Sequence, residues 1–374
     1  MADELICVCH TRLASGFELY ADLHLPLHRA PITVLFGPSG AGKTTLLRML
    51  AGLERPLDGA IAFRGQPWFD AARGICLAPQ QRRAGYVAQD YALFPHLTVA
   101  ENVAYAARPG NRREYLETFG LSGLASRHPR AISNGQRQRV ALARALAAEP
   151  ALLLLDEPLS ALDAATRART RQQLRTLLLT SGVPCIVVTH DRMEAMALGD
   201  WIAVISDGRV RQCGPVHDVF QRPADAEVAE SVGVENVLPA RIVSRDAGLL
   251  TLETGGARLQ SIDSGETGAA QLQAIDSDET DQVVACIRAE DVALARDSAP
   301  VSSIRNRLSG RVISVTVEGP LARVELDCGF PLVATITAQS AHELELKPGD
   351  AVCAIVKTTS VHVAAHSGGA NDQD

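Results

Sequence analysis

The chain has 374 residues, 47% of them hydrophobic and 21% charged, and its formal net charge is −7. This composition is typical of a globular protein with room for two or three domains, and the acidic balance argues against a general nucleic-acid binder. Eight cysteines without C-x-x-C spacing favour reduced thiols in the cytosol over a zinc site or a disulfide framework.

The first motif in chain order is a phosphate-binding loop. An apolar run at 32–36 predicts a buried strand and 45–51 predicts a helix, and the pattern G-x-x-x-x-G-K-T lies between them. Glycines allow backbone N–H groups to surround phosphate oxygens, Lys43 can reach the outer phosphates, and Thr44 offers a hydroxyl to Mg²⁺. The expected ATP contacts here are Gly37, Pro38, Ser39, Gly40, Ala41, Gly42, Lys43, Thr44 and Thr45.

A second buried strand, at 151–156, ends in two carboxylates. Such a strand brings Asp156 to the sheet edge beside the phosphate loop, where it can hold Mg²⁺, and places Glu157 to polarise an attacking water. Helices are expected at 140–148, 166–180 and 191–198, with strands at 185–189 and 201–206. Alternating strands and helices predict an α/β domain with a largely parallel sheet over residues 1–232.

The pattern changes after about residue 230. Strand-like runs separated by turns, with few helices, predict a small all-β barrel of the OB-like kind over residues 233–366. Within it, Leu259–Thr267 is nearly repeated as Leu272–Thr280, and residues 259–281 are expected to form an acidic insertion. The polar, Gly-rich residues 367–374 are expected to be a disordered tail.

The segment Ile132-Ser133-Asn134-Gly135-Gln136 precedes an Ala/Leu-rich helix and resembles the L-S-G-G-Q signature of ATP-binding-cassette ATPases. The resemblance implies a head-to-tail homodimer in which Ser133, Gly135 and Gln136 complete the ATP site of the other copy. Asn134 departs from the family glycine, and asparagine tolerates a left-handed backbone better than most residues.

Further residues match the family pattern. The resemblance implies that Gln89 contacts Mg²⁺ and the attacking water, that Asp163 lies in a loop crossing the dimer interface, and that His190 touches the γ-phosphate. Phe17 is the candidate for the aromatic side chain that stacks on adenine, with Tyr20 as the alternative. The Mg²⁺ contacts implied are therefore Thr44, Gln89 and Asp156, and the catalytic residues are Glu157, His190 and Gln89.

Two sets of segments resemble the molybdate importers of this family. The first is Gly74–Val87 followed by Leu93–His96, and the second is Ser303–Val312 with Glu343–Gly349 and Ala354–Lys357. The second set resembles a small molybdate-binding barrel module, in which Ser303, Arg305 and Lys357 supply donors to a tetrahedral oxyanion or, alternatively, only hold barrel strands together.

The resemblance implies an ATPase subunit of a bacterial molybdate or tungstate importer. Its partners are a second copy, integral-membrane permease subunits and, indirectly, a periplasmic substrate-binding protein. With no signal peptide or membrane-length apolar run expected, the chain is placed at the cytoplasmic face of the cell membrane. Two alternatives stay open: the same role for sulfate, ferric iron or a polyamine, and an intracellular oxyanion sensor.

Overall fold

The computed structural model describes residues 3–107, 112–160, 162–263, 282–296 and 303–366. The chain divides into two compact units, Met1–Val219 and Phe220–Asp374. The division precedes the boundary expected at residue 232, because helix α9 (Ala226–Ser231) contacts strands β12 (Asn236–Asp246) and β15 (Gln282–Ile287) of the second unit and buries Val228 and Ala229. The disordered tail expected at 367–374 lies outside the described residues.

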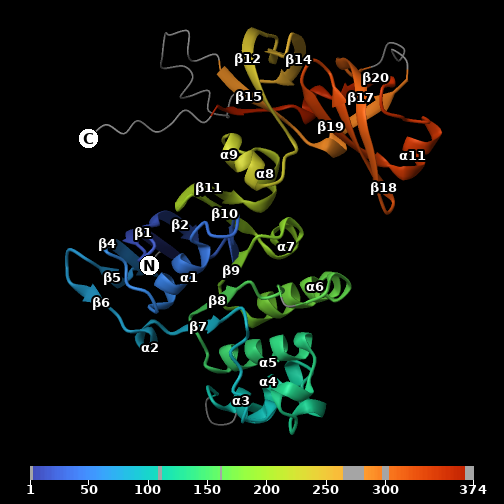
Figure 1. Ribbon diagram of the computed structural model, residues 1–374. Coiled ribbons are helices and arrows are strands. Elements are labelled where there is room, and N and C mark those ends of the chain that lie inside the picture. The colour runs from blue at the N-terminus through green and yellow to red at the C-terminus, as the bar shows by residue number, and fades with distance from the viewer. Residues whose placement is uncertain (1–2, 108–111, 161, 264–281, 297–302, 367–374) are drawn as a thin grey trace. The chain divides into compact units, whose positions relative to one another are not determined.

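The first unit is built on one sheet in the order β6-β5-β4-β1-β2-β11-β10-β3-β9-β8-β7. Its parallel part holds β10, β3, β9, β8 and β7, and β1, β2, β4, β5 and β6 pair antiparallel at the other end (Figure 1). The strands are β1 (Glu4–Arg12), β2 (Glu18–Pro26), β3 (Ile32–Phe36), β4 (Asp58–Phe63), β5 (Gln66–Asp70), β6 (Ile75–Cys76), β7 (Ala84–Val87), β8 (Leu152–Asp156), β9 (Cys185–Thr189), β10 (Trp201–Ser206) and β11 (Arg209–Pro215).

Helices cover both faces of the parallel strands. Every residue of β3, β8 and β9 is buried, which is why these strands read as continuous apolar runs. Alternate residues face a core on the α1 side and a second core on the side of α3, α5 and α6. The helices are α1 (Lys43–Ala51), α2 (Pro79–Arg82), α3 (Val99–Ala104), α4 (Arg112–Thr118), α5 (Asn134–Ala147), α6 (Ala164–Ser181), α7 (Arg192–Leu198) and α8 (Val216–Gln221), the last spanning the division between the units.

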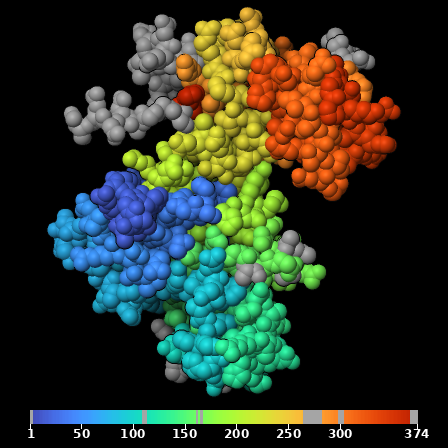
Figure 2. All heavy atoms as spheres, viewed as in Figure 1, coloured from blue at the N-terminus to red at the C-terminus, as the bar shows by residue number. Residues whose placement is uncertain are grey.

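Helices α3, α4 and α5 gather at one end of the first unit, as the teal and green atoms of Figure 2 show. Short 3-10 turns at Ser122–Leu124 and Pro129–Ala131 connect α4 to α5. Helix α5 starts where Ser133 caps it: the Ser133 hydroxyl accepts from the N–H of Gln136, and the Gln136 side chain accepts from the N–H of Ser133. The predicted order of strand, loop and helix in this unit is confirmed.

The second unit consists of two five-stranded antiparallel sheets around one shared core. The first has the order β14-β13-β12-β15-β21 and the second β16-β20-β17-β18-β19. The strands are β12 (Asn236–Asp246), β13 (Leu249–Thr254), β14 (Ala257–Ile262), β15 (Gln282–Ile287), β16 (Val292–Ala295), β17 (Asn306–Glu318), β18 (Leu321–Asp327), β19 (Pro331–Thr337), β20 (Ala351–Val356) and β21 (His362–Ala365), and the short helix α11 (Ala338–Glu343) lies between β19 and β20. The all-β second domain is therefore confirmed.

Two buried asparagines join these sheets. Asn236 on β12 donates to the carbonyls of Ile287 and Val333 and accepts from the N–H of Val333 on β19. Asn306 on β17 bonds both backbone groups of Gln260 on β14. Each amide thus replaces a backbone partner between strands of different sheets, which satisfies groups that the core would otherwise leave unpaired.

The acidic insertion begins later than expected. The first part of the near-repeat, Leu259–Ile262, is not in an insertion but forms strand β14 paired with β13, and Leu259 is fully buried. The alternation of apolar Leu259 with polar Gln260 matches the period of a strand with one buried face. Residues 264–281, which hold the end of the first copy and the whole of the second, lie outside the described residues. Among the residues that are described, no helix has the length and apolarity needed to span a membrane.

Candidate functional site

The phosphate loop joins β3 to α1, as expected. Gly37, Gly40 and Gly42 have φ values of 149°, 86° and 98°, in the region that disfavours side chains. A Cβ at Gly37 would lie 2.0 Å from the carbonyl oxygen of Ile205 on β10. The loop can therefore pass this close to β10 only because residue 37 is glycine.

Lys43 is buried at the first position of α1. Its Nζ donates to the carbonyl oxygens of Gly37, at 2.8 Å, and of Pro38, at 2.6 Å. Burial lowers the pKa of Lys43, and the negative charges of Glu157 and Asp156 act in the opposite direction. The loop thus holds a desolvated cation bonded to neutral oxygens, in a position where a phosphate oxygen would be a stronger acceptor.

Asp156 ends β8 beside the start of α1. Its Oδ1 accepts from the Thr44 hydroxyl at 2.9 Å, and its Oδ2 accepts from the Tyr86 hydroxyl at 3.1 Å. Burial raises the pKa of Asp156, while these two hydrogen bonds lower it. Tyr86 was not predicted; the only sequence signal for it is its place on β7, whose side chains reach the same sheet edge.

Glu157, Gln89 and His190 meet next to this pair. The Glu157 Oε2 accepts from Gln89 Nε2 at 3.3 Å, and its Oε1 lies 2.9 Å from His190 Nδ1. Three sequence-distant positions, each just beyond a parallel strand, therefore form one cluster. Glu157 also has a φ of +43°, an uncommon backbone conformation for glutamate, and such strained residues occur preferentially at functional sites.

A cavity of about 530 Å³ opens beside Gln89 and the Thr44–Asp156 pair. Its lining includes Thr44, Gln89 and Asp156, the three expected Mg²⁺ contacts, together with Arg48 and Tyr86. The lining supplies a hydroxyl, an amide oxygen and a carboxylate, which are the oxygen ligands that Mg²⁺ prefers. The residues present therefore fit a Mg²⁺ ion and the phosphates of ATP.

Ser133, Gly135 and Gln136 do not line that cavity. They stand at the start of α5 and border a different pocket between α5 and α6. Asn134 has a helical backbone, not the left-handed one considered for it, because it is the first residue of α5; its side-chain oxygen accepts from Arg137. Asp163 is exposed just before α6, and its carbonyl accepts from the N–H of Arg167.

Phe17 lies in the turn between β1 and β2, next to the phosphate loop. A Cβ built on Gly42 would approach its ring to 3.3 Å. Tyr20 is engaged elsewhere: its ring stacks on His10 with centroids 4.3 Å apart, and the guanidinium of Arg209 covers it. Of the two aromatics, Phe17 is the one beside the loop.

The candidate oxyanion residues lie at one end of the second unit's β16–β19 sheet. Ser303 and Arg305 precede β17, and Lys357 follows β20. Because Asn306 pairs with Val356, Arg305 and Lys357 are the next facing positions along the two strands. All three side chains are exposed, and no ion pair of Arg305 or Lys357 occurs within the described ranges.

Each of the two units contains a segment that matches a known protein family. A family model described as ABC transporter matches residues 20–160, and one described as TOBE domain matches residues 302–363. The chain is 42% identical over 344 residues to the molybdenum import ATP-binding protein ModC of Brucella melitensis, covering 89% of this chain and 92% of that protein. It is 38% identical over 354 residues to the sulfate/thiosulfate import ATP-binding protein CysA 2 of Chromobacterium violaceum, covering 91% of this chain and 90% of that protein.

A solved structure gives the same result for the first unit. The cbiO1 protein of Clostridium perfringens, part of the ABC transporter complex cbiONQ, has a TM-score of 0.51 at 26% identity, covering 63% of this chain and 95% of that one. The identity to relatives over nine-tenths of the chain, the two family models and the geometry around Lys43, Asp156 and Glu157 agree. The chain belongs to the family of ABC transporter ATPases, which bind ATP with Mg²⁺ and hydrolyse it, and it carries a TOBE domain.

Proposed function

We propose that this chain is the ATP-hydrolysing subunit of a bacterial importer for molybdate and, by the same chemistry, tungstate. The observation that supports it most is the cluster in which Gln89 and His190 bond the carboxylate of Glu157 beside the Thr44–Asp156 pair. The substrate rests on the relatives named as molybdenum import proteins, of which one from Thiobacillus denitrificans is 39% identical over 360 residues.

In this proposal the residues of the site have separate roles in ATP binding and hydrolysis. Lys43 and the loop N–H groups bind the outer phosphates, and Thr44, Asp156 and Gln89 would hold Mg²⁺, which neutralises phosphate charge when bound. Glu157 accepts the proton of the attacking water, because each of its carboxylate oxygens keeps a second lone pair beyond its bond to Gln89 or His190. His190 and Gln89 orient that carboxylate and contact the γ-phosphate side of the site.

Two copies act together in this proposal. Ser133, Gly135 and Gln136 line a different pocket from Thr44, Gln89 and Asp156, which supports a role for the signature residues at the ATP site of the other copy. A head-to-tail dimer would bring them to the phosphates of the other copy, with Asp163 at the interface and Phe17 against adenine. Closure of that dimer on ATP then moves the membrane permease subunits that the chain attaches to at the cytoplasmic face. A periplasmic binding protein delivers the substrate to those subunits.

The second unit supplies an oxyanion site in this proposal. Arg305 and Lys357 face each other at adjoining strand ends without a carboxylate partner in the described ranges, and Ser303 adds a hydroxyl. Two neighbouring cations repel each other, and a tetrahedral dianion between them removes that repulsion. The site would let the imported anion regulate the ATPase.

The hydrolytic role is tested with Glu157→Gln. The amide keeps the size of the side chain but cannot accept a proton, so hydrolysis should fall about 10²- to 10⁴-fold while ATP binding persists. Trapping of an ATP-bound dimer, seen by size-exclusion chromatography, is the accompanying result. Normal turnover in this variant would remove Glu157 from the mechanism.

The substrate is tested by calorimetry with molybdate, tungstate and sulfate on the full chain and on an Arg305→Ala, Lys357→Ala double variant. Binding of molybdate and tungstate that disappears in the variant supports both the substrate and the site. Preference for sulfate would favour the second candidate, a sulfate importer, which the Chromobacterium relative motivates. Binding without any ATPase activity would favour an oxyanion sensor.

A further inference from the structure

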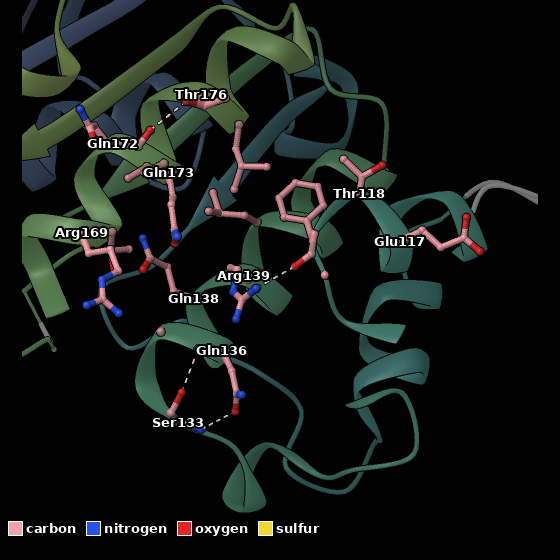
Figure 3. Close-up of a pocket in the computed structure, with 17 residues that line it drawn as sticks. Glu117, Thr118, Ser133, Gln136, Gln138, Arg139, Arg169, Gln172, Gln173 and Thr176 are labelled. Carbon is pink, nitrogen blue, oxygen red and sulfur yellow. Dashed lines mark hydrogen bonds between the residues drawn. The ribbon is translucent and has the colours of Figure 1, made fainter. Parts of the chain in front are cut away.

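A pocket of about 910 Å³ lies between α5 and α6, next to the turn that ends α4 (Figure 3). Its volume falls within the range of small-molecule sites, roughly 300–1,000 Å³. The signature residues Ser133 and Gln136 border one end, but most of the wall comes from the second and third turns of α5 and from the middle of α6. None of the roles proposed above uses that larger part.

One wall of the pocket holds a buried side chain without a hydrogen-bond partner. Gln138 on α5 is 1% exposed, and among the residues that the structure describes neither its amide nitrogen nor its amide oxygen has a hydrogen-bond partner. Figure 3 shows Gln138 of α5 and Gln173 of α6 extending toward each other across the space between the helices. A buried amide without hydrogen bonds lowers the stability of the folded state. A ligand that supplies one acceptor and one donor would remove this penalty.

The charges around Gln138 are positive. Arg139 donates one N–H to the carbonyl of Phe119. In the described part of the chain, neither Arg139 nor Arg169 on α6 has a carboxylate partner. Glu117, the acid in the lining, is already paired with Arg113 at 2.8 Å. The free donors therefore favour an anion, such as a phosphate group.

The remaining wall is apolar. Leu142 of α5 faces the lining from one side, and Leu174 and Leu177 of α6 from the other. Apolar side chains on facing helices suit a flat ring, whose faces need no hydrogen bonds. The pocket thus offers an apolar wall, an amide that presents one donor and one acceptor, and two guanidinium groups.

We propose that this pocket is a second nucleotide site, which binds a purine nucleoside monophosphate of the adenine type. The Gln138 amide matches the adenine edge, donating from Nε2 to N7 and accepting at Oε1 from the 6-amino group. Guanine offers two acceptors at the same edge and leaves Oε1 unpaired. Arg139 and Arg169 take the phosphate. A ligand here contacts the helix that carries Ser133 and Gln136, which makes it a regulator of the ATPase.

The test uses AMP, GMP and adenosine with the full-length Lys43→Ala protein, so that the phosphate loop contributes little to binding. Calorimetry should show AMP bound about tenfold more tightly than GMP. Gln138→Leu should abolish that preference, and Arg169→Ala should weaken AMP but leave adenosine unchanged. No AMP binding, or AMP binding that neither substitution alters, overturns the proposal.

A second measurement does not depend on any ligand. Without nucleotide, Gln138→Leu removes an unpaired amide and should raise the melting temperature of the first unit by about 2–4 °C. Tryptophan fluorescence follows that unit, since Trp68 and Trp201 both lie in it. The matched control is Gln80→Leu, at an exposed glutamine, which should leave the melting temperature unchanged. A lower melting temperature for Gln138→Leu would mean that the amide is already satisfied, and the site would be withdrawn.

Discussion

The buried amide of Asn236 should be among the largest single contributors to the stability of the second unit. We consider Asn236→Leu, which keeps the number and branching of the side-chain heavy atoms and removes every hydrogen bond of the amide. The substitution leaves three backbone groups without their partner: the carbonyl of Ile287 and both the N–H and the carbonyl of Val333. These bonds join β12 and β15 to β19, so the loss falls on the contact between the two sheets.

The magnitude follows from how deeply each group is buried. Ile287 is fully buried, so its carbonyl loses a partner that water cannot replace, at about 1–3 kcal/mol. Val333 is half-buried, and water can satisfy part of what it loses. The extra apolar surface that leucine buries offsets a fraction of this loss of stability. The expected decrease in the free energy of unfolding is about 2–4 kcal/mol.

Hydrogen exchange read by mass spectrometry is the appropriate assay, because the second unit has no tryptophan and peptides from β15 and β19 report on each sheet separately. The matched variant is Asn306→Leu, which removes the hydrogen bonds of the second buried asparagine to Gln260 on the facing sheet. Protection should fall in both sheets for either variant. A decrease below about 1 kcal/mol for Asn236→Leu, or a loss confined to β12, would refute the role of this amide.

Three further outcomes are expected. Lys43→Ala should weaken ATP binding about 10²-fold or more by calorimetry, because the phosphates lose a buried cation; unchanged affinity would remove Lys43 from the site. Gly37→Ala should lower the free energy of unfolding of the first unit, measured in urea, by about 1–3 kcal/mol or more. Gly40→Ala, whose Cβ meets nothing within 4 Å, should lower it less. Equal decreases would show that the clash with Ile205 does not matter. Burial lowers the pKa of His362 below its ordinary 6.5. The second unit should therefore keep the stability that the neutral imidazole contributes above pH 6.5 and lose it as the pH falls toward the lowered folded-state pKa. The same decline in His362→Gln, measured by hydrogen exchange, would contradict this.

Much of the fold could be predicted from local sequence, for a physical reason. Strands β3, β8 and β9 are short apolar runs buried on both faces, and the glycine-rich loop and the Ser133 cap each follow from chemistry within a few residues. The family resemblance implied that Gln89 and His190 act at the same site as Glu157, and Glu157 does contact both, because parallel strands end at one edge of a sheet. The assignment of Leu259–Ile262 to an insertion was wrong, since similarity to a neighbouring segment hid the strand alternation.

The sequence by itself determined which residues are suited to bind phosphate and metal, because those residues act through their own chemistry and that of their immediate neighbours. Only the tertiary structure decided which groups are desolvated and which partners they have. Tyr86 on Asp156, the links made by Asn236 and Asn306, and the unpaired amide of Gln138 all depend on contacts between segments far apart in the chain. Such contacts are set by how helices and sheets pack, and no local pattern of residues encodes them.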